Sequence, residues 1–494
     1  MDEVEELHSL SRINTSMQWQ KSRLLWLKEG DANSKFFHGI MSSRRRANSI
    51  VSLSVNGIVV DGVADVRSVV FNHFSSHFRS VDMERPSVSN LDFKKLNLGQ
   101  CGELIKPFTV EEVKHAVWDC DNFKSPGPDG VNSGFMRFIS EFHRNGKLSK
   151  GLNGTFIALI PKVESPQRLN DFRPISMVGS LYKVLSKVLA NRLRVVMSNV
   201  ISETQSAFIH GRQILDGILI ASELVEDARH LKKDLLLFKV DFEKTFDSID
   251  WSYLEVVMKK MNFPTLWHKW ILECITTTSA SVLVNGCPTD EFRFERGLRQ
   301  GDPLSPFLFL IAAEGLHVMM NALVEAGLFT SYKVGADNLA SITHLQFADD
   351  TLLVGDRSWA NIRALKALLL LFEASFGLKV NFHKSMLLSV NIHDSWLAEA
   401  AFVLNCKLGH VPFLYLGLPI GGDSHKLKFW QPLIDRIKSR LSGWKSKNLS
   451  FGGRLVLLKF VLSSLPIYFL SFFKAPSGII SSIESLFNCF FWGK

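Results

Sequence analysis

The 494-residue sequence contains few cysteines. The six stand at positions 101, 120, 274, 287, 406 and 489 and form no C-x-x-C pair. No histidine cluster with the spacing of zinc ligands accompanies them. This pattern excludes a disulfide-rich secreted domain and a structural zinc site, and it indicates a reduced intracellular compartment.

The sequence also lacks a secretory signal and a long uninterrupted apolar run. Its first residues, MDEVEELHSL, are acidic and polar. The longest apolar stretch, residues 456–473, contains Lys459 and Pro466, whereas a membrane span needs about twenty apolar residues with few or no charges. We therefore expect a buried helix at 456–473 and no membrane partner.

The composition is that of a globular protein. Hydrophobic residues make up 46% and charged residues 21% of the chain, which excludes a disordered protein. The length predicts about two to four domains or lobes. The net charge of +9 suits a polyanionic partner.

Two adjacent carboxylates interrupt an apolar run at HLQFADDTLLV, residues 344–354. Consecutive side chains on a strand point to opposite faces, so we predict two short strands folded at residues 348–350. Asp349 and Asp350 held close together would repel unless a cation lies between them. A divalent ion for phosphoryl transfer is one interpretation, and a solvent-exposed hairpin tip is the other.

Hydrophobic periodicity predicts strands mixed with long helices, and therefore an α+β or α/β fold. Asn56-Gly57 predicts a hairpin. Strands are expected at 155–162 and 234–242, and helices at 180–202, from 303–306 onward, and at 360–377. The apolar stripe of the 180–202 helix is Leu181, Val184, Leu185, Val188, Leu189, Leu193 and Val196, which leaves Lys183, Lys187, Arg192 and Arg194 for other faces.

Asp241 follows an apolar strand in FKVDFEKTFDSIDW, where either a metal ligand or a helix cap is expected. Between Asp241 and the Asp-Asp turn lies RGLRQGDPLSP, a polar glycine-bearing turn before a long apolar helix. The amino terminus of such a helix suits phosphate or a nucleic-acid backbone.

Taken in order, these segments resemble the palm of a reverse transcriptase, and most closely that of plant non-LTR (LINE-type) retrotransposons. Further motifs carry the resemblance: LIPKVESPQRLNDFRPISMVGSLYKVLSKVLANRL, QSAFIHGRQILDG, FGLKVNFHKS and YLGLPIGG. The resemblance implies a right-hand polymerase of α+β class, with an antiparallel palm sheet backed by helices. Asp241, Asp349 and Asp350 would then hold two Mg²⁺ ions, with Mn²⁺ as a substitute, in a two-metal site.

The resemblance also implies substrate contacts. Phe246 matches the aromatic residue that excludes a 2′-hydroxyl, with core packing as the alternative. Gln300 matches the glutamine that approaches the incoming nucleotide. Lys384 matches the lysine near the triphosphate, a candidate proton donor to the leaving group. The arginines with possible phosphate or template contacts are Arg168, Arg173, Arg296 and Arg299.

The chain departs from the family pattern at three places. Thr245 stands where relatives commonly have alanine. The stretch between the SPGPDG loop and LIPK is short near residues 138–141, as if a helix were missing. No endonuclease constellation or Cys/His-rich segment is visible, so we expect no self-sufficient transposition. The implied parts are a linker-like region (1–105), fingers (106–234), palm (235–421) and thumb helices (422–494).

The interpretation is therefore an RNA-directed DNA polymerase acting on an RNA template, a DNA primer and dNTPs, located in the nucleus or cytoplasm. The alternatives are a non-catalytic nucleic-acid-binding remnant of the same fold and, more distantly, a group II intron maturase. The lack of a recognisable maturase RNA-binding domain counts against the last. The sequence does not determine the oligomeric state.

Overall fold

The structure, a computed structural model, describes residues 42–43, 49–55, 57–80, 85–86, 90–119, 133–163, 165–337, 340–442 and 449–493. The chain forms two compact units, residues 50–416 and residues 1–49 together with 417–494. The segment 1–41, part of the predicted linker-like region, and most of the loop at 123–134, which contains SPGPDG, lie outside the described residues.

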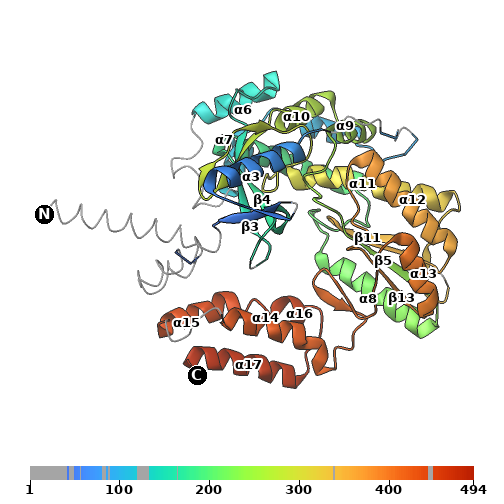
Figure 1. Cartoon of the computed structure of the whole chain (residues 1–494). Helices are drawn as coiled ribbons and strands as arrows, with labels where there is room; N and C mark the ends of the chain where they lie inside the picture. The colour runs from blue at the N-terminus through green and yellow to red at the C-terminus, as the bar shows by residue number, and fades with distance from the viewer. Residues whose placement is uncertain are drawn as a thin grey trace. The chain divides into compact units, whose positions relative to one another are not determined.

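The larger unit contains a five-stranded sheet, which we call the central sheet (Figure 1). Its strand order is β11 (His344–Phe347), β12 (Asp350–Gly355), β5 (Leu235–Val240), β13 (Met386–Val390) and β14 (Lys407–Leu408). β12 and β13 both pair antiparallel with β5, whose LLLFKV sequence is buried almost throughout. Helices α8 (Ile214–Leu231) and α13 (Asp394–Leu404) pack against this sheet.

A second sheet joins distant parts of the sequence. β3 (Gly154–Pro161) pairs antiparallel with β4 (Phe172–Val178) and parallel with β6 (Ser279–Val284), and β6 also pairs with β7 (Cys287–Pro288) and β8 (Phe292–Arg293). The 3-10 helix η2 (Leu169–Asp171) lies between β3 and β4 along the chain. A strand from the predicted palm range thus completes the sheet of the predicted fingers range.

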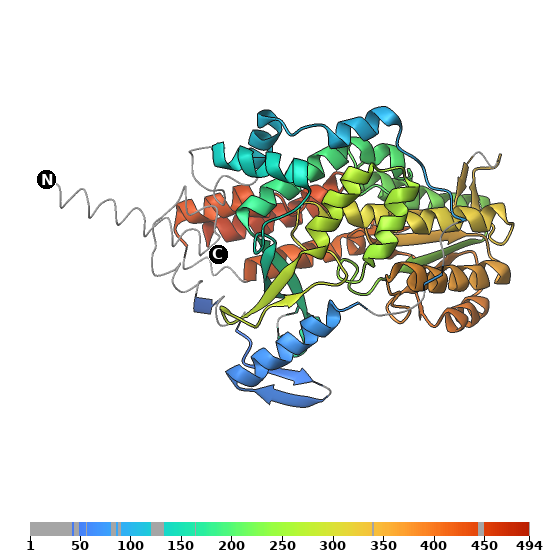
Figure 2. The same ribbon diagram turned by 90° about the horizontal axis from the view of Figure 1, so that it is seen from above.

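The amino-terminal part of the larger unit packs on this second sheet. The hairpin of β1 (Ser52–Val55) and β2 (Ile58–Asp61) is followed by α3 (Val63–His77), which contacts β6. Figure 2 shows this hairpin and α3 side by side. The Phe78 ring stacks on Phe294 with centroids 3.8 Å apart. Residues 50–78, assigned above to a linker-like region, therefore share a hydrophobic cluster with the second sheet.

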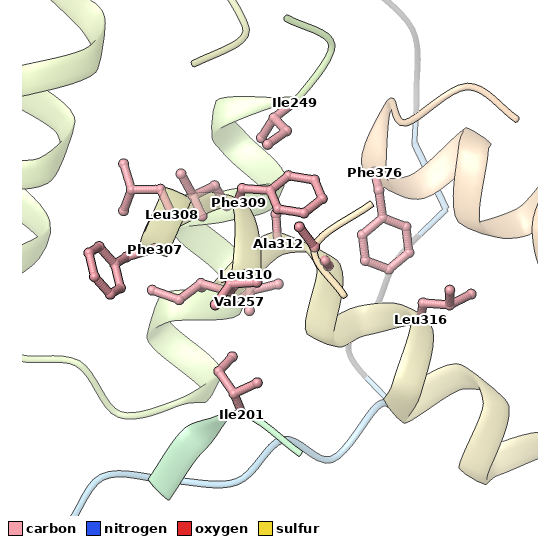
Figure 3. Packing of buried hydrophobic residues seen from close by; sticks show 14 of the residues in the cluster. Ile201, Ile249, Val257, Phe307, Leu308, Phe309, Leu310, Ala312, Leu316 and Phe376 are labelled. Atoms are coloured by element: carbon pink, nitrogen blue, oxygen red, sulfur yellow. The ribbon is translucent and has the colours of Figure 1, made fainter. Parts of the chain in front are cut away.

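Helix α11 (Ser305–Glu325) is the core helix of the larger unit. Figure 3 shows its apolar side chains Phe307, Leu308 and Phe309 packed among residues that include Ile249 and Val257. α11 is long and apolar enough to span a membrane, but 67% of its most apolar window is buried inside the protein, as expected of a core helix. The helices that contact α11 are α7 (Ser180–Val200), α9 (Trp251–Lys260) and α12 (Trp359–Phe376), and α10 (Thr265–Thr276) contacts α9.

The remaining elements of this unit are short or peripheral. Helices α4 (Leu98–Ile105) and α5 (Val110–Asp119) contact α7, and α6 (Ser133–Asn145) precedes β3. The helix α6 runs without a break through residues 138–141, where the resemblance led us to expect a shortening. The small strands are β9 (Tyr332–Val334), β10 (Ala340–Ile342) and β15 (Phe413–Tyr415).

The second unit is mainly helical in its described part. It contains β16 (Leu418–Ile420), η3 (Leu427–Trp430), α14 (Gln431–Ser442), α15 (Phe451–Leu457), the π-helix η5 (Leu458–Leu462), α16 (Ile467–Leu470) and α17 (Ser477–Trp492). The expectation of one buried helix at 456–473 is wrong, because three helical pieces cover this range. Proline has no N–H group and restricts its predecessor, and Pro466 stands at the break before α16. Phe460 and Ile467 are exposed.

The other local expectations are largely confirmed. The α+β class, the hairpin of β1 and β2 and the fold of the chain at Ala348–Asp349 are as predicted, whereas Asn56 of the predicted turn lies outside the described residues. In the described part of the chain, Cys101, Cys274, Cys287, Cys406 and Cys489 are free thiols. The face assignment of α7 is partly wrong, because Leu181 is exposed and Arg192 is buried.

Candidate active site

The carboxylates meet at one end of the central sheet. β11 and β12 form a hairpin with Phe347 paired to Asp350, and between them Ala348 has a positive φ of 54°. β12 pairs with β5 through Thr351 and Val240. In an antiparallel pair the next residues along, Asp350 and Asp241, face each other across the two strands. The turn at Ala348 places Asp349 beside them.

The charges of these side chains interact. Partial burial raises the pKa of Asp241, Lys384 opposes this shift, and the charge of Asp349 adds to it. Burial also raises the pKa of Asp350, and Asp349 raises it further. Thr245 donates a hydrogen bond from Oγ1 to Oδ2 of Asp349 at 3.2 Å. The carboxylates thus repel one another, and a bound cation would relieve that repulsion.

A loop after α12 holds the backbone of Asp241. The N–H of Asp241 donates to Ser385 Oγ at 3.0 Å, and the carbonyl of Asp241 accepts from Asn381 N at 2.8 Å. Ser385 Oγ in turn donates to the Asn381 carbonyl at 2.8 Å. The NFHKS motif therefore fixes the end of β5 and presents Lys384 next to Asp241.

A cavity of about 560 Å³ opens beside the carboxylates. This volume lies in the range of small-molecule sites. Its lining combines acidic, cationic, amide and aromatic side chains from both sheets and from α3: His73, Phe74, His77, Lys162, Leu169, Asn170, Phe172, Arg173, Pro174, Asp241, Phe242, Glu243, Lys244, Thr245, Phe246, Asp247, Gln300, Asp349, Asn381 and Lys384.

Four cationic side chains, Lys162, Arg173, Lys244 and Lys384, share this lining. Burial lowers the pKa of Lys162, and the nearby charges of Arg173 and Lys384 lower it further. Burial also lowers the pKa of Lys244. Positive charges collected in a partly buried cavity favour a polyanionic ligand, because the anion removes their mutual repulsion.

Phe246 and Gln300 border the same cavity. Phe246 packs against Phe309 with ring centroids 5.0 Å apart, so its ring belongs to both the cavity wall and the core. Gln300 donates from Nε2 to Asp247 Oδ1 at 3.0 Å. The other Asp247 oxygen lies 3.7 Å from His77 Nε2.

Six of the predicted site residues thus lie around one cavity: Asp241, Phe246, Gln300, Asp349, Lys384 and Arg173. Asp350 adjoins the cavity without lining it, and its charge interacts with those of Asp241 and Asp349. Arg168 is exposed, lies outside the lining, and donates its backbone N–H to Asp171.

The structure separates Arg299 and Arg296 from the cavity. Arg299 is buried, pairs with Asp302 at 2.8 Å and lies 4.1 Å over the Tyr182 ring. Arg296 donates from Nε and Nη2 to the His77 carbonyl at 2.9 and 2.7 Å. In this structure both guanidinium groups stabilise the fold, and the phosphate contact predicted for Arg299 is not available to its buried side chain.

The sequence analysis missed several lining residues. Lys162 directly follows β3 in the LIPK motif, and Lys244 and Asp247 neighbour Asp241 in EKTFD, so their motifs offered a signal. His73 and His77 come from α3, far away along the chain, and no local pattern marks them.

The donor set fits Mg²⁺ in one respect. Within the residues that the structure describes, no group of three acidic, histidine or cysteine side chains could hold a metal ion alone. Mg²⁺ commonly takes one or two protein carboxylates and completes its shell with water and substrate phosphate. Asp241 and Asp349, which repel each other beside an open cavity, provide such a partial shell.

Comparison with known proteins gives consistent similarities. Residues 160–420 match the family described as reverse transcriptase (RNA-dependent DNA polymerase). The whole chain is 23% identical to the Transposon TX1 uncharacterized 149 kDa protein of Xenopus laevis, of which it spans 38%. Over 52% of its length it is 25% identical to the Retrovirus-related Pol polyprotein from type-1 retrotransposable element R2 of Nasonia vitripennis, of which it spans 25%.

Two further similarities are more limited. A stretch covering 12% of the chain is 44% identical to 10% of a putative ribonuclease H protein of Arabidopsis thaliana. Among solved structures, apo telomerase from Candida Tropicalis matches 71% of this chain and 65% of its own, at 15% identity and a TM-score of 0.38. The chain spans well under half the length of the Xenopus and Nasonia relatives.

Proposed function

The chain belongs to the reverse transcriptase (RNA-dependent DNA polymerase) family, and from this premise we propose that it is a nucleotidyltransferase that extends a DNA primer on an RNA template. The reaction joins the primer 3′-oxygen to the α-phosphorus of a dNTP and releases pyrophosphate. One observation carries the proposal: Asp241 and Asp349 share a single cavity with four cationic side chains. Carboxylates for metal and cations for phosphate are the groups that phosphoryl transfer requires.

Asp241, Asp349 and Asp350 would hold two Mg²⁺ ions, with Mn²⁺ as a substitute. Bound metal would activate the primer hydroxyl and stabilise the pyrophosphate. The support for this assignment is the raised pKa of Asp241 and of Asp350, which partial burial causes and the charge of Asp349 increases. Thr245 orients one of the carboxylates through its hydrogen bond to Asp349.

The cationic side chains bind and orient the triphosphate. Lys162 and Arg173 approach from the β3–β4 sheet, and Lys244 and Lys384 approach from the carboxylate side. Lys384, whose charge acts on Asp241, is the proposed proton donor to the departing pyrophosphate. Gln300, held by Asp247, approaches the incoming nucleotide.

The proposed biological source is a plant non-LTR retrotransposon, with an RNA template in the nucleus or cytoplasm. The similarity to the Pol polyprotein of the retrotransposable element R2 supports the element class. The short stretch of high identity to an Arabidopsis thaliana protein supports the plant source. We also propose that residues 106–234 form the fingers, 235–421 the palm and 422–494 the thumb of this polymerase.

Asp349→Asn tests the catalytic assignment. An amide supplies no charge to a metal ion, so we expect the variant to lose Mg²⁺-dependent extension of a DNA primer on an RNA template. Primer–template binding should persist. The matched control is Asp290→Asn, since Asp290 is an exposed aspartate in the loop before β8.

Equal extension by wild type and Asp349→Asn would contradict the metal assignment. A wild-type chain that binds primer–template but does not extend it, with either Mg²⁺ or Mn²⁺, would instead identify the chain as a non-catalytic remnant of the fold.

A further inference from the structure

The loop that follows α7 is attached to the carboxylate hairpin. Gln205 and Gln346 form a parallel β-bridge. Gln346 N donates to the Thr204 carbonyl at 2.8 Å, and Ser206 N donates to the Gln346 carbonyl at 2.9 Å. This short segment, residues 204–206, therefore extends the central sheet beyond β11, directly before the turn that carries Asp349.

The Gln205 side chain contacts the turn itself. It is buried, with an exposed fraction of 1%. Its Oε1 accepts from Ala348 N at 2.9 Å and from Ala207 N at 3.0 Å, and its Nε2 donates to the Ala348 carbonyl at 3.3 Å. One amide thus satisfies both backbone groups of Ala348.

Ala348 needs such support because of its backbone conformation. Its φ of 54° lies in the left-handed region, where the Cβ of any non-glycine residue is crowded. Ala348 immediately precedes Asp349, so its dihedral angles set the direction in which that carboxylate leaves the sheet. Strained residues of this kind persist where surrounding contacts fix them.

The loop that carries Gln205 is itself held from two sides. Arg212 donates to the carbonyls of Ser202, Gln205 and Ile201. Glu314 on α11 accepts from Ser202 N at 2.9 Å and from Ser202 Oγ at 3.2 Å. The core helix and the QSAFIHGRQ segment therefore give Gln205 a fixed position.

We propose that Gln205 is a positioning residue that keeps Ala348 in its left-handed conformation and so directs the Asp349 carboxylate into the cavity. This proposal rests on the polymerase function proposed above. It gives the QSAFIHGRQ segment, which contributes no residue to the lining, a specific role in the reaction. Supporting hydrogen bonds of this kind can determine whether a catalytic group is aligned.

Gln205→Met tests the proposal, because methionine keeps the approximate shape of glutamine and removes its hydrogen bonds. We expect kcat for primer extension to fall roughly a hundredfold, the order expected for a misplacement of about 1 Å, while the Kd for primer–template stays unchanged. Amide hydrogen exchange in residues 344–354 should rise about tenfold, while α11 stays protected.

Gln346→Met is the matched control. Gln346 is a buried glutamine on the same hairpin, and among the described residues its Oε1 has no hydrogen-bond partner. We expect this variant to keep both the kcat and the exchange rate of the wild type. Loss of kcat with unchanged exchange in Gln205→Met, or equal loss in both variants, would overturn the proposal.

Rescue separates positioning from a general loss of structure. Glycine adopts positive φ without a Cβ clash. Adding Ala348→Gly to Gln205→Met should therefore raise kcat at least about tenfold above that of Gln205→Met, to about a tenth of the wild-type value. A double variant no faster than Gln205→Met would overturn the proposal. If the wild type does not extend primers at all, the polymerase function fails, whereas the exchange measurement still decides whether Gln205 holds the turn.

Discussion

At the scale of single residues, Phe246 shows how one side chain serves both cavity and core. Its ring lines the cavity and also packs on Phe309. The sequence left steric exclusion and core packing as alternatives. The contact with Phe309 shows the packing, and steric exclusion stays a prediction. The effect of a substitution at Phe246 must therefore be measured as nucleotide selectivity, because a change in stability alone would not distinguish steric exclusion from core packing.

We expect Phe246→Ala to increase the use of ribonucleotides. Removal of the ring opens the space where a 2′-hydroxyl would clash, so the ratio of rNTP to dNTP incorporation should rise. Phe242→Ala is the matched control, because Phe242 is a neighbouring aromatic residue of the same lining. An unchanged ratio in Phe246→Ala would leave only a packing role.

Single residues also show what sequence reasoning could identify. Asp241 and Asp349 stand in motifs where a carboxylate interrupts an apolar strand, and this contrast with their neighbours made them visible. Arg192 and Arg299 are ordinary cations in the sequence, and their burial depends on distant partners: Glu112 for the first, Asn153 and Tyr182 for the second. No local pattern contains that information.

At the scale of elements, α7 illustrates the same limit. Its period correctly predicted a helix, but α4, α5 and α11 all pack around it, so one apolar stripe does not describe it. Arg192 on α7 connects this helix with α5 and with α4. Its guanidinium pairs with Glu112 on α5 at 2.9 Å and donates to the carbonyls of Leu104, Lys106 and Pro107 at the end of α4.

Arg192→Leu should therefore lower the free energy of unfolding by about 1–3 kcal/mol, because the carbonyls at the end of α4 lose their buried hydrogen-bond donor and Glu112 loses its ion pair. Chemical denaturation followed by tryptophan fluorescence measures this. The control is Lys187→Leu on the same helix, whose more exposed pair with Asp119 should contribute at most about 1 kcal/mol. Equal stability of the two variants would contradict the assignment.

The Arg192 contribution should depend on pH. Although burial opposes the shift, hydrogen bonds from Arg192 and from the Thr109 backbone lower the pKa of Glu112 from its ordinary value of 4.5. A carboxylate with a lowered pKa stabilises the fold above its ordinary value, and this stabilisation is lost as the pH falls through the folded-state pKa. The difference in the free energy of unfolding between wild type and Arg192→Leu should therefore become smaller as the pH falls through the folded-state pKa of Glu112.

At the scale of the whole molecule, the net charge can be read directly from the sequence, whereas the pairing of distant strands and the placement of α3 cannot. The excess of 57 basic over 48 acidic residues is independent of the fold. The joining of β6 to β3 and the placement of α3 at the cavity depend on contacts between segments far apart in sequence. Individual strands and helices were therefore predictable, whereas their assembly into one cavity came only through the family resemblance.

We expect binding to a primer–template duplex to weaken with salt, because neutralised phosphates release counterions. The logarithm of affinity should fall linearly with the logarithm of salt concentration, with a slope near −0.9 for each phosphate contacted on B-form DNA. If exposed Arg168 contacts a phosphate, Arg168→Gln should reduce the slope by about one. A flat salt response would remove the electrostatic argument.

The packing of α3 on the second sheet affects how the protein can be shortened for expression. A fragment cut to the matched region, residues 160–420, would begin inside β3 and would omit Phe78 and the histidines of α3. Phe292 and Phe294 would lose the Phe78 ring that stacks on both of them and would become more exposed, which favours aggregation. The border of family similarity is therefore not a folding border, and an expression fragment that keeps the cavity wall needs residues 50–80.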